Sequence, residues 1–258
     1  MLMNKAVEVK TPAELLIMKQ AGGVVADILV LLKDTIKAGM TTGEIDQISR
    51  AELKKRNAKP AFLNYHGFPG VICVSINSEV VHGIPSDKRV LKESDIVGLD
   101  FGCVIDGWFA DSAMTVPVGK ISDDAERLIR VTREALMKGI AVVKDGARIG
   151  DIGSAVQTHA EAAGYSLVRE FVGHGIGRAL HEEPPIPNYG KAGTGGRLKA
   201  GMTIAIEPMV NMGGPEVATL GDGWTAVTKD GKLSGHFEHT VAVTETGYEI
   251  LTLPTAKI

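Results

Sequence analysis

Four carboxylates of this sequence lie inside segments with the residue pattern of β-strands: Asp100, Asp111, Glu207 and Glu238. Because side chains alternate between the two faces of a strand, Asp100 and Glu207 each share a face mainly with small residues. Buried acids repel one another and are costly without compensation, and no matching set of Lys or Arg occurs in these segments. If the four acids converge, we expect metal cations to compensate their charge.

Histidines in glycine-containing segments supply candidate nitrogen ligands. His174 lies between two glycines, which let the backbone and a metal approach closely, and His181 follows seven residues later. His82 begins a His-Gly-Ile triplet that also occurs at His174, whereas we interpret His66 as structural. Carboxylates and one neutral imidazole together predict a pair of divalent metal ions bridged by acids.

The chain contains an internal repeat with an offset of 107 residues. Residues 37–45 resemble residues 144–152, since 144 − 37 = 107. Residues 91–100 parallel residues 198–207 at the same offset, since 207 − 100 = 107. In both copies the strand-like segment ends on a carboxylate, so a functional site between the two copies is expected.

Each copy shows the same order of predicted elements. A first helix begins after Thr11 or at Ser122, and a second begins near Thr42 or near Asp151, the latter ending at Gly164. Strand patterns follow in both copies. This order predicts an α+β fold with pseudo-two-fold symmetry, in which strands line a shared centre and helices lie outside. No linker divides the chain, so we expect one catalytic domain over residues 1–258, with halves of about 11–118 and 119–250.

Composition excludes several classes of function. The 28 Lys and Arg and 31 Asp and Glu give a net charge of −3 without a basic cluster, which excludes specific nucleic-acid binding. The apolar run from Val24 to Leu32 is shorter than the ~18 residues of a membrane span, so no membrane partner is expected. Two cysteines, Cys73 and Cys103, are too few for a disulfide framework, and the first ten residues lack the apolar core of a signal peptide. We therefore expect a cytoplasmic protein.

Several ordered motifs resemble those of type I methionine aminopeptidases of the short, bacterial-like kind. The resemblance extends from Thr11 to Val243. The motifs are Gly-His-Gly-Ile-Gly-Arg from Gly173 with His-Glu-Glu-Pro from His181, Ile-Glu-Pro-Met-Val from Ile206, Asp-Gly-Trp from Asp222, Phe-Glu-His-Thr from Phe237, and the spacing of Asp100 and Asp111. Each motif alone is weak, but the ordered set is specific.

This resemblance implies a duplicated "pita-bread" fold, with a central curved antiparallel sheet and helices outside, and a dinuclear site. The implied metal ligands are Asp100, Asp111, His174, Glu207 and Glu238, of which Asp111 and Glu238 bridge the ions. The two divalent ions are drawn from Co, Mn, Fe or Zn. His82, His181 and Glu207 would be catalytic, with His82 and His181 facing the substrate.

The resemblance also implies a substrate. The family removes the N-terminal methionine from nascent proteins and peptides and prefers a small second residue. Its apolar methionine pocket corresponds to Phe62, Tyr65, Phe68, Cys73 and Trp224. A transient contact with the ribosome and a monomeric protein are further expectations.

Four positions depart from the pattern of the family. Gly102 stands where a hydroxyl residue is frequent, and His236 stands where a glutamine is expected. Phe62 and Phe68 stand where other side chains are common. Changes around metal ligands typically alter metal affinity by about 10- to 100-fold, so Gly102 and His236 bear on affinity more than on the reaction.

Two other functions are compatible with the same fold. One is an Xaa-Pro aminopeptidase or prolidase, although such proteins usually carry an additional N-terminal domain. The other is a non-catalytic relative that serves as a binding module, although every expected ligand position here holds a competent residue. Peptide cleavage and metal content would separate these functions.

Overall fold

The computed structural model describes residues 7–255 of the chain. Residues 1–6, part of the segment in which no signal peptide is expected, lie outside the described residues. The helices are α1 (Pro12–Thr35), α2 (Thr42–Lys55), the short 3-10 helix η1 (Tyr65–Gly67), α3 (Asp123–Ala141) and α4 (Ile149–Ala162). The strands are β1 (Lys59–Pro60), β2 (Ile72–Ile76), β3 (Glu79–Val81), β4 (Ile96–Ile105), β5 (Trp108–Pro117), β6 (Ser166–Leu167), β7 (Gly173–Gly175), β8 (Glu182–Ile186), β9 (Thr203–Ile206), β10 (Met209–Asn211), β11 (Val217–Thr219), β12 (Ala226–Thr228), β13 (Ser234–His236), β14 (Glu238–Val243) and β15 (Tyr248–Ile250).

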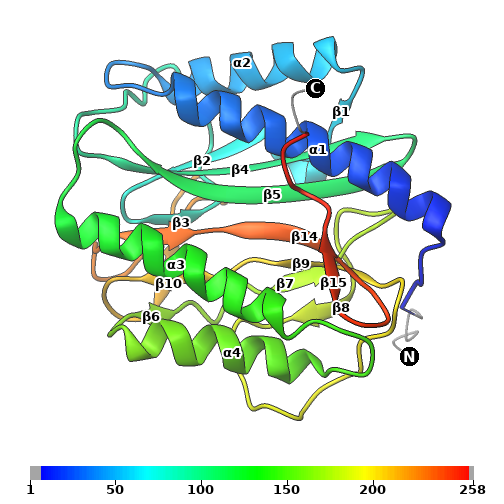
Figure 1. The fold of residues 1–258 in the computed structure, drawn as a ribbon. Coiled ribbons are helices and arrows are strands. Elements are labelled where there is room, and N and C mark those ends of the chain that lie inside the picture. Colours follow the sequence, from blue (N-terminus) through cyan, green and yellow to red (C-terminus); the bar gives the residue numbers. More distant parts are fainter. Residues whose placement is uncertain (1–6, 256–258) are drawn as a thin grey trace.

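A nine-stranded antiparallel sheet forms the centre of the molecule. Its main path is β1-β4-β5-β14-β9-β7-β8, with β2 paired to β4 and β15 paired to β14. Figure 1 shows α1 and α2 together on the side of β4 and β5, and α3 and α4 on the side of β9 and β10. The strands thus occupy the centre and the helices lie outside, as the repeated order of elements predicts.

The internal repeat is visible in the main-chain hydrogen bonds. The Leu91 N–H donates to the Met40 carbonyl at 2.8 Å, and 107 residues later the Leu198 N–H donates to the Ala147 carbonyl at 2.7 Å. Isolated bridges at Thr41 and Arg148, which are also 107 residues apart, reinforce the match. The two copies therefore use the same connection between their second helix and the loop before their long strand.

Capping residues explain where the helices begin. Thr11 and Glu14 form a capping box at α1, and Ser122 caps α3, as predicted. The predicted start of α4 near Asp151 is two residues late. The helix begins at Ile149 because the Asp151 carboxylate reaches back to accept from the Arg148 N–H at 2.8 Å. Gly164, with φ of 85°, follows the end of α4 as predicted.

Helix α1 is more apolar than the sequence pattern indicated. Of the helices in the described part of the chain, α1 is the one long and apolar enough to cross a membrane. Half of its most apolar 18-residue stretch is buried inside the protein. Residues such as Ala21, Val25 and Leu29 belong to a hydrophobic cluster that also contains residues of β4 and β5. Its apolar composition is therefore accounted for by packing against the sheet.

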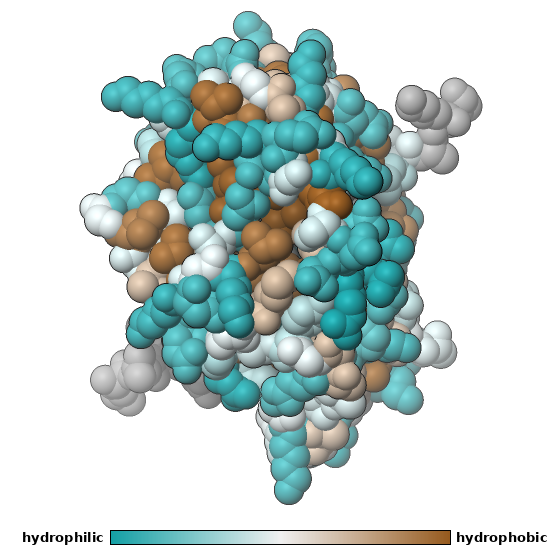
Figure 2. Space-filling model, turned by 90° about the vertical axis from the view of Figure 1, so that its left-hand side faces the viewer, coloured by the Kyte–Doolittle hydropathy of each residue, from teal (hydrophilic) through white to brown (hydrophobic). Residues whose placement is uncertain are grey.

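Exposed hydrophobic side chains are dispersed over the surface. The face shown in Figure 2 is largely hydrophilic, with hydrophobic residues in separate patches. Large exposed hydrophobic residues include Leu16, Val90, Met137, Leu220 and Tyr248, which belong to different elements or loops. Dispersed apolar residues of this kind are normal on a protein surface.

The close approach of α1 to the chain at Leu251 predicts that a larger residue at Gly22 lowers the stability of the protein. A Cβ atom at Gly22 would lie 2.2 Å from the Leu251 carbonyl oxygen, so that the backbone would have to move. We expect Gly22→Ala to lower the free energy of unfolding by about 1 to 3 kcal/mol, measured by chemical denaturation. Gly23→Ala is the control, because its Cβ would press only on the end of the Thr255 side chain. Equal stability of the two variants would contradict this packing.

Candidate active site

Neighbouring strands of the central sheet bring three of the carboxylates onto one face. Asp100 of β4 and Glu238 of β14 lie on either side of Ala113 in β5, because both are paired with that residue. Asp111 precedes Ala113 by two residues and therefore shares its face. The antiparallel register thus explains why acids distant in the sequence converge.

The second copy, to which Glu238 belongs, also supplies the remaining two candidate ligands. His174 of β7 is paired with Ala205 of β9, and Ala205 is also paired with Thr240 of β14. Glu207 directly follows β9, two residues after Ala205. His174 and Glu207 therefore reach the site from the half of the sheet that lies across β14 from Asp111.

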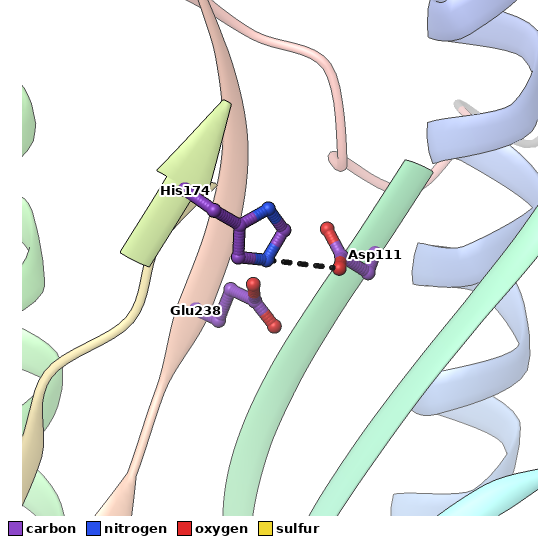
Figure 3. Close-up of side chains that lie close together, drawn as sticks. All are labelled: Asp111, His174 and Glu238. Carbon is purple, nitrogen blue, oxygen red and sulfur yellow. Dashed lines mark ion pairs between the residues drawn. The ribbon is translucent and has the colours of Figure 1, made fainter. Parts of the chain in front are cut away.

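Donor atoms of these residues lie close together without forming hydrogen bonds to one another. One donor atom each from Asp111, His174 and Glu238 lie within 4.8 Å of one another (Figure 3). His174 Nε2 is 3.6 Å from Asp111 Oδ2 and 3.6 Å from Glu207 Oε1. These distances exceed that of a hydrogen bond, but they suit atoms that share an ion as ligands.

Burial makes the charged form of these carboxylates unfavourable in the metal-free protein. It raises the pKa of Asp111 to about 6. Burial, followed by repulsion from neighbouring acids, raises the pKa of Asp100, Glu207 and Glu238 well above their usual values. Such shifts indicate that the site needs a cation if all four groups are to ionise near neutral pH.

His174 is held in the form that a metal requires. Burial lowers its pKa to about 4, so the imidazole is neutral. The ring atom Nδ1 is 2.9 Å from the Gly175 carbonyl, to which only a protonated nitrogen can donate. Nε2 therefore carries the lone pair and points toward Asp111 and Glu207.

The composition of the site fits divalent metal ions. Among the described residues, those that line the surrounding cavity include no Lys or Arg that could neutralise the acids. Carboxylate oxygens and a neutral imidazole nitrogen are suitable ligands for Mn, Fe, Co or Zn. The residues present thus fit the metal that the resemblance implies.

All the candidate site residues line one cavity of about 270 Å³. Its lining consists of Phe62, Tyr65, His66, Phe68, Cys73, His82, Asp100, Asp111, His174, Leu180, His181, Glu207, Trp224 and Glu238. Leu180 was not predicted from the sequence, and His66 was interpreted as structural although it also reaches the cavity. Carboxylates and apolar side chains are both part of this lining.

The apolar part of the cavity is formed by packed aromatic rings. The rings of Phe68 and Trp224 meet edge to face, with centroids 5.2 Å apart. The main chain at Trp224 is held by Asp222, whose carboxylate accepts from the main-chain N–H of Trp224 at 2.9 Å. Burial and the nearby Asp100 raise the pKa of the Cys73 thiol well above its usual value, so that Cys73 presents a neutral, apolar surface.

Two departures from the family pattern are coupled by sterics. A Cβ atom at Gly102 would lie 2.9 Å from Cε1 of the Phe62 ring and 3.0 Å from Cβ of Ala61. The ring of Phe62 therefore occupies space that a side chain at position 102 would need. The small residue at 102 and the large residue at 62 form a compatible pair.

His181 reaches the cavity from a loop that is tied down by a buried ion pair. Lys10 Nζ is 2.7 Å from Glu182 Oε2, and the other Glu182 oxygen accepts from the Arg178 N–H at 2.7 Å. His181 Nδ1 is 2.7 Å from the Tyr65 hydroxyl. Burial lowers the pKa of both His181 and His82 to about 4, so both rings are neutral.

A family model described as metallopeptidase family M24 matches residues 17–245. The chain belongs to this family. Methionine aminopeptidase 1 of Bacillus subtilis (strain 168) is 54% identical over 243 residues, which are 94% of this chain and 98% of that protein. Membership in a metallopeptidase family identifies the chain as a metal-dependent hydrolase.

Solved structures confirm the fold. The methionine aminopeptidase from Thermotoga maritima has a TM-score of 0.95 and 47% identity, with 96% of this chain and 100% of that chain covered. The prolidase from Pyrococcus horikoshii OT3 has a TM-score of 0.76 at 22% identity, with 96% of this chain and 64% of that chain covered, and it shows the fold alone. The M24 chain described here therefore has the predicted duplicated pita-bread fold.

The raised pKa of Asp111 predicts that the stability of the metal-free M24 chain depends on pH. Its pKa rises from 3.8 to about 6 on folding, so the folded protein binds this proton more tightly than the unfolded chain does. The stabilisation is therefore complete below about pH 3.8 and is lost as the pH rises through about 6. Asp111→Asn removes this titration. We expect the variant to gain about 2 kcal/mol relative to wild type between about pH 4.5 and about pH 7.5, measured by urea denaturation in a chelator. Parallel pH profiles for the two proteins would contradict the shift.

Proposed function

We propose that this chain is a metal-dependent aminopeptidase that removes the N-terminal methionine from peptides and nascent proteins with a small second residue. The observation that carries the proposal is the convergence of four buried or half-buried carboxylates and one neutral imidazole on the wall of an aromatic cavity. The 54% identity to a methionine aminopeptidase over 98% of that protein supports the same activity. The pocket and the site lie together, as removal of one particular terminal residue requires.

Five residues would hold two divalent ions of Mn, Fe, Co or Zn. They are Asp100, Asp111, His174, Glu207 and Glu238, with Asp111 and Glu238 shared between the ions. The short distances among Asp111, His174 and Glu238 support this assignment. When bound, such ions act as Lewis acids and make water a nucleophile at neutral pH.

Apolar residues of the cavity would select the methionine side chain. Phe62, Phe68 and Cys73 are almost fully buried and present carbon and sulfur rather than charge. Tyr65 and Trp224 complete the pocket. A flexible, unbranched thioether suits a pocket lined with aromatic rings, because sulfur makes favourable contacts with ring edges.

Glu207 would move the proton during cleavage. Its carboxylate lies beside His174, and burial with two neighbouring acids raises its pKa, so it can accept a proton from water and hold it. The proton would then pass from a carboxylate oxygen of Glu207 to the leaving amine. This role requires no further acid in the cavity.

His82 and His181 would act on the peptide as neutral imidazoles. His181 Nδ1 is engaged by the Tyr65 hydroxyl, which leaves Nε2 to face the peptide and stabilise the oxygen that becomes negative. His82 lines the same cavity, with its ring centroid 6.2 Å from that of Trp224, and would bond near the scissile nitrogen. Their pKa values of about 4 keep both rings uncharged at neutral pH.

Neither alternative function is favoured. The prolidase with the same fold is 22% identical, far below the 47% of the methionine aminopeptidase from Thermotoga maritima. A binding module without catalysis would have no need for crowded acids whose pKa values are raised.

The setting of the reaction follows from its proposed substrate. We propose that the enzyme works in the cytoplasm as a monomer over one catalytic domain with halves of about 11–118 and 119–250. A transient ribosome contact is part of the proposal, because nascent chains emerge there. Co-sedimentation with translating ribosomes and size-exclusion chromatography address these two points.

The function is tested by metal removal and replacement. We expect the chelated protein to be inert and Mn²⁺ or Co²⁺ to restore release of methionine from Met-Ala-Ser, with no cleavage of Ala-Pro. His174→Ala should bind metal at least about 100-fold more weakly and release no methionine, because it loses the nitrogen ligand. His159→Ala, on α4 beside Glu134, is the matched control and should behave as wild type. Cleavage of Ala-Pro alone, or full activity of His174→Ala, would refute the proposal.

His82 provides a separate test of the mechanism. We expect His82→Ala to keep the metal content of wild type while kcat for Met-Ala-Ser falls by about 100-fold, because a hydrogen-bond donor near the reacting nitrogen is lost. Metal content is measured by elemental analysis and turnover by chromatography. An unchanged kcat would remove His82 from the reaction.

A further inference from the structure

Two buried polar atoms without a partner lie around Glu207. Among the described residues, Asn188 Oδ1 and His236 Nε2 are the buried side-chain atoms that lack a hydrogen-bond partner. The Asn188 side-chain amide donates to the Glu207 carbonyl at 3.0 Å, and His236 Nε2 lies 3.8 Å from Glu207 Oε2. Buried polar groups are nearly always paired, so two such exceptions beside one residue, of which His236 Nε2 is the one near its carboxylate, indicate a functional environment.

The position of His236 is fixed by its own main chain. His236 ends β13 and is paired with Met209, two residues after Glu207. The Thr115 hydroxyl accepts from the His236 N–H and donates to the His236 carbonyl, both at 2.9 Å. The side chain is 4% exposed, so the imidazole has little freedom to turn toward solvent.

We propose that His236 is a positioning residue for Glu207, to whose Oε2 the His236 Nε2–H donates a hydrogen bond when the carboxylate is ionised. A shift of about 0.8 Å would bring the two atoms from 3.8 Å to the distance of a normal N–H···O bond. The other oxygen, Glu207 Oε1, is the one that lies 3.6 Å from His174 Nε2. By holding Glu207 Oε2, His236 leaves Oε1 to face His174.

The role proposed for position 236 requires a hydrogen-bond donor rather than a positive charge. The His236 ring is buried, and its unpaired Nε2 lies 3.8 Å from Glu207 Oε2, so an N–H on this nitrogen can donate to that oxygen. An ionised carboxylate only accepts hydrogen bonds, so the proton must be on Nε2. A glutamine amide also offers an N–H and can substitute for this function, whereas an alanine cannot.

This inference rests on the proposed metal site and is tested by calorimetric titration of the metal-free protein with Mn²⁺. We expect His236→Ala to bind Mn²⁺ about 10- to 100-fold more weakly than wild type, and His236→Gln to return to within about threefold. Turnover of Met-Ala-Ser should show a lower kcat with little change in KM for His236→Ala. His159→Gln, which alters a histidine far from the site, should match wild type.

The outcomes separate this inference from the proposed function. If wild-type protein binds no Mn²⁺, the metal site itself is refuted. If wild type binds and His236→Ala binds equally well, or if Ala and Gln variants are equally impaired, the positioning role of His236 is refuted. Should His236→Ala fail to fold, ¹⁵N NMR of the wild-type imidazole gives the answer, because a proton on Nδ1 in the Zn²⁺-loaded protein would overturn the proposal.

Discussion

Repulsion among four carboxylates in a buried place without a positive side chain is the constraint on which the rest of this molecule depends. Burial raises the pKa of Asp111 to about 6, and burial together with repulsion from nearby acids raises the pKa of Asp100 and Glu238 well above normal. At neutral pH such crowding requires either that the acids keep their protons or that a cation joins the group. The neutral His174, whose Nδ1 donates to the Gly175 carbonyl, can offer a nitrogen ligand without adding charge.

The register of the central sheet sets the positions of these acids relative to one another. Asp100 of the first copy and Glu238 of the second flank Ala113 across neighbouring strands, while His174 and Glu207, also of the second copy, lie beyond β14. Each copy has its own connection between its second helix and the loop before its long strand, seen at Leu91 and Leu198. A site between two copies also leaves room beside it for an aromatic pocket, which the loop of His181 completes.

Periodic and local signals in the sequence were sufficient to predict the repeat, the helix starts at Thr11 and Ser122, and the α+β class. The motifs of the family were sufficient to nominate residues that all line one cavity. Other features depend on tertiary contacts that no local pattern encodes. The Lys10–Glu182 pair joins residues 172 positions apart, and the fit of Phe62 over Gly102 appears only when both are in place. The start of α4 differed because Asp151 caps the helix from inside rather than beginning it.

Anomalous diffraction from crystals of the protein loaded with Mn²⁺ would test the central claim most directly. Two anomalous peaks enclosed by Asp100, Asp111, His174, Glu207 and Glu238 are the predicted result. A structure with those carboxylates side by side and no peak among them, under conditions in which the protein releases methionine, would contradict the account.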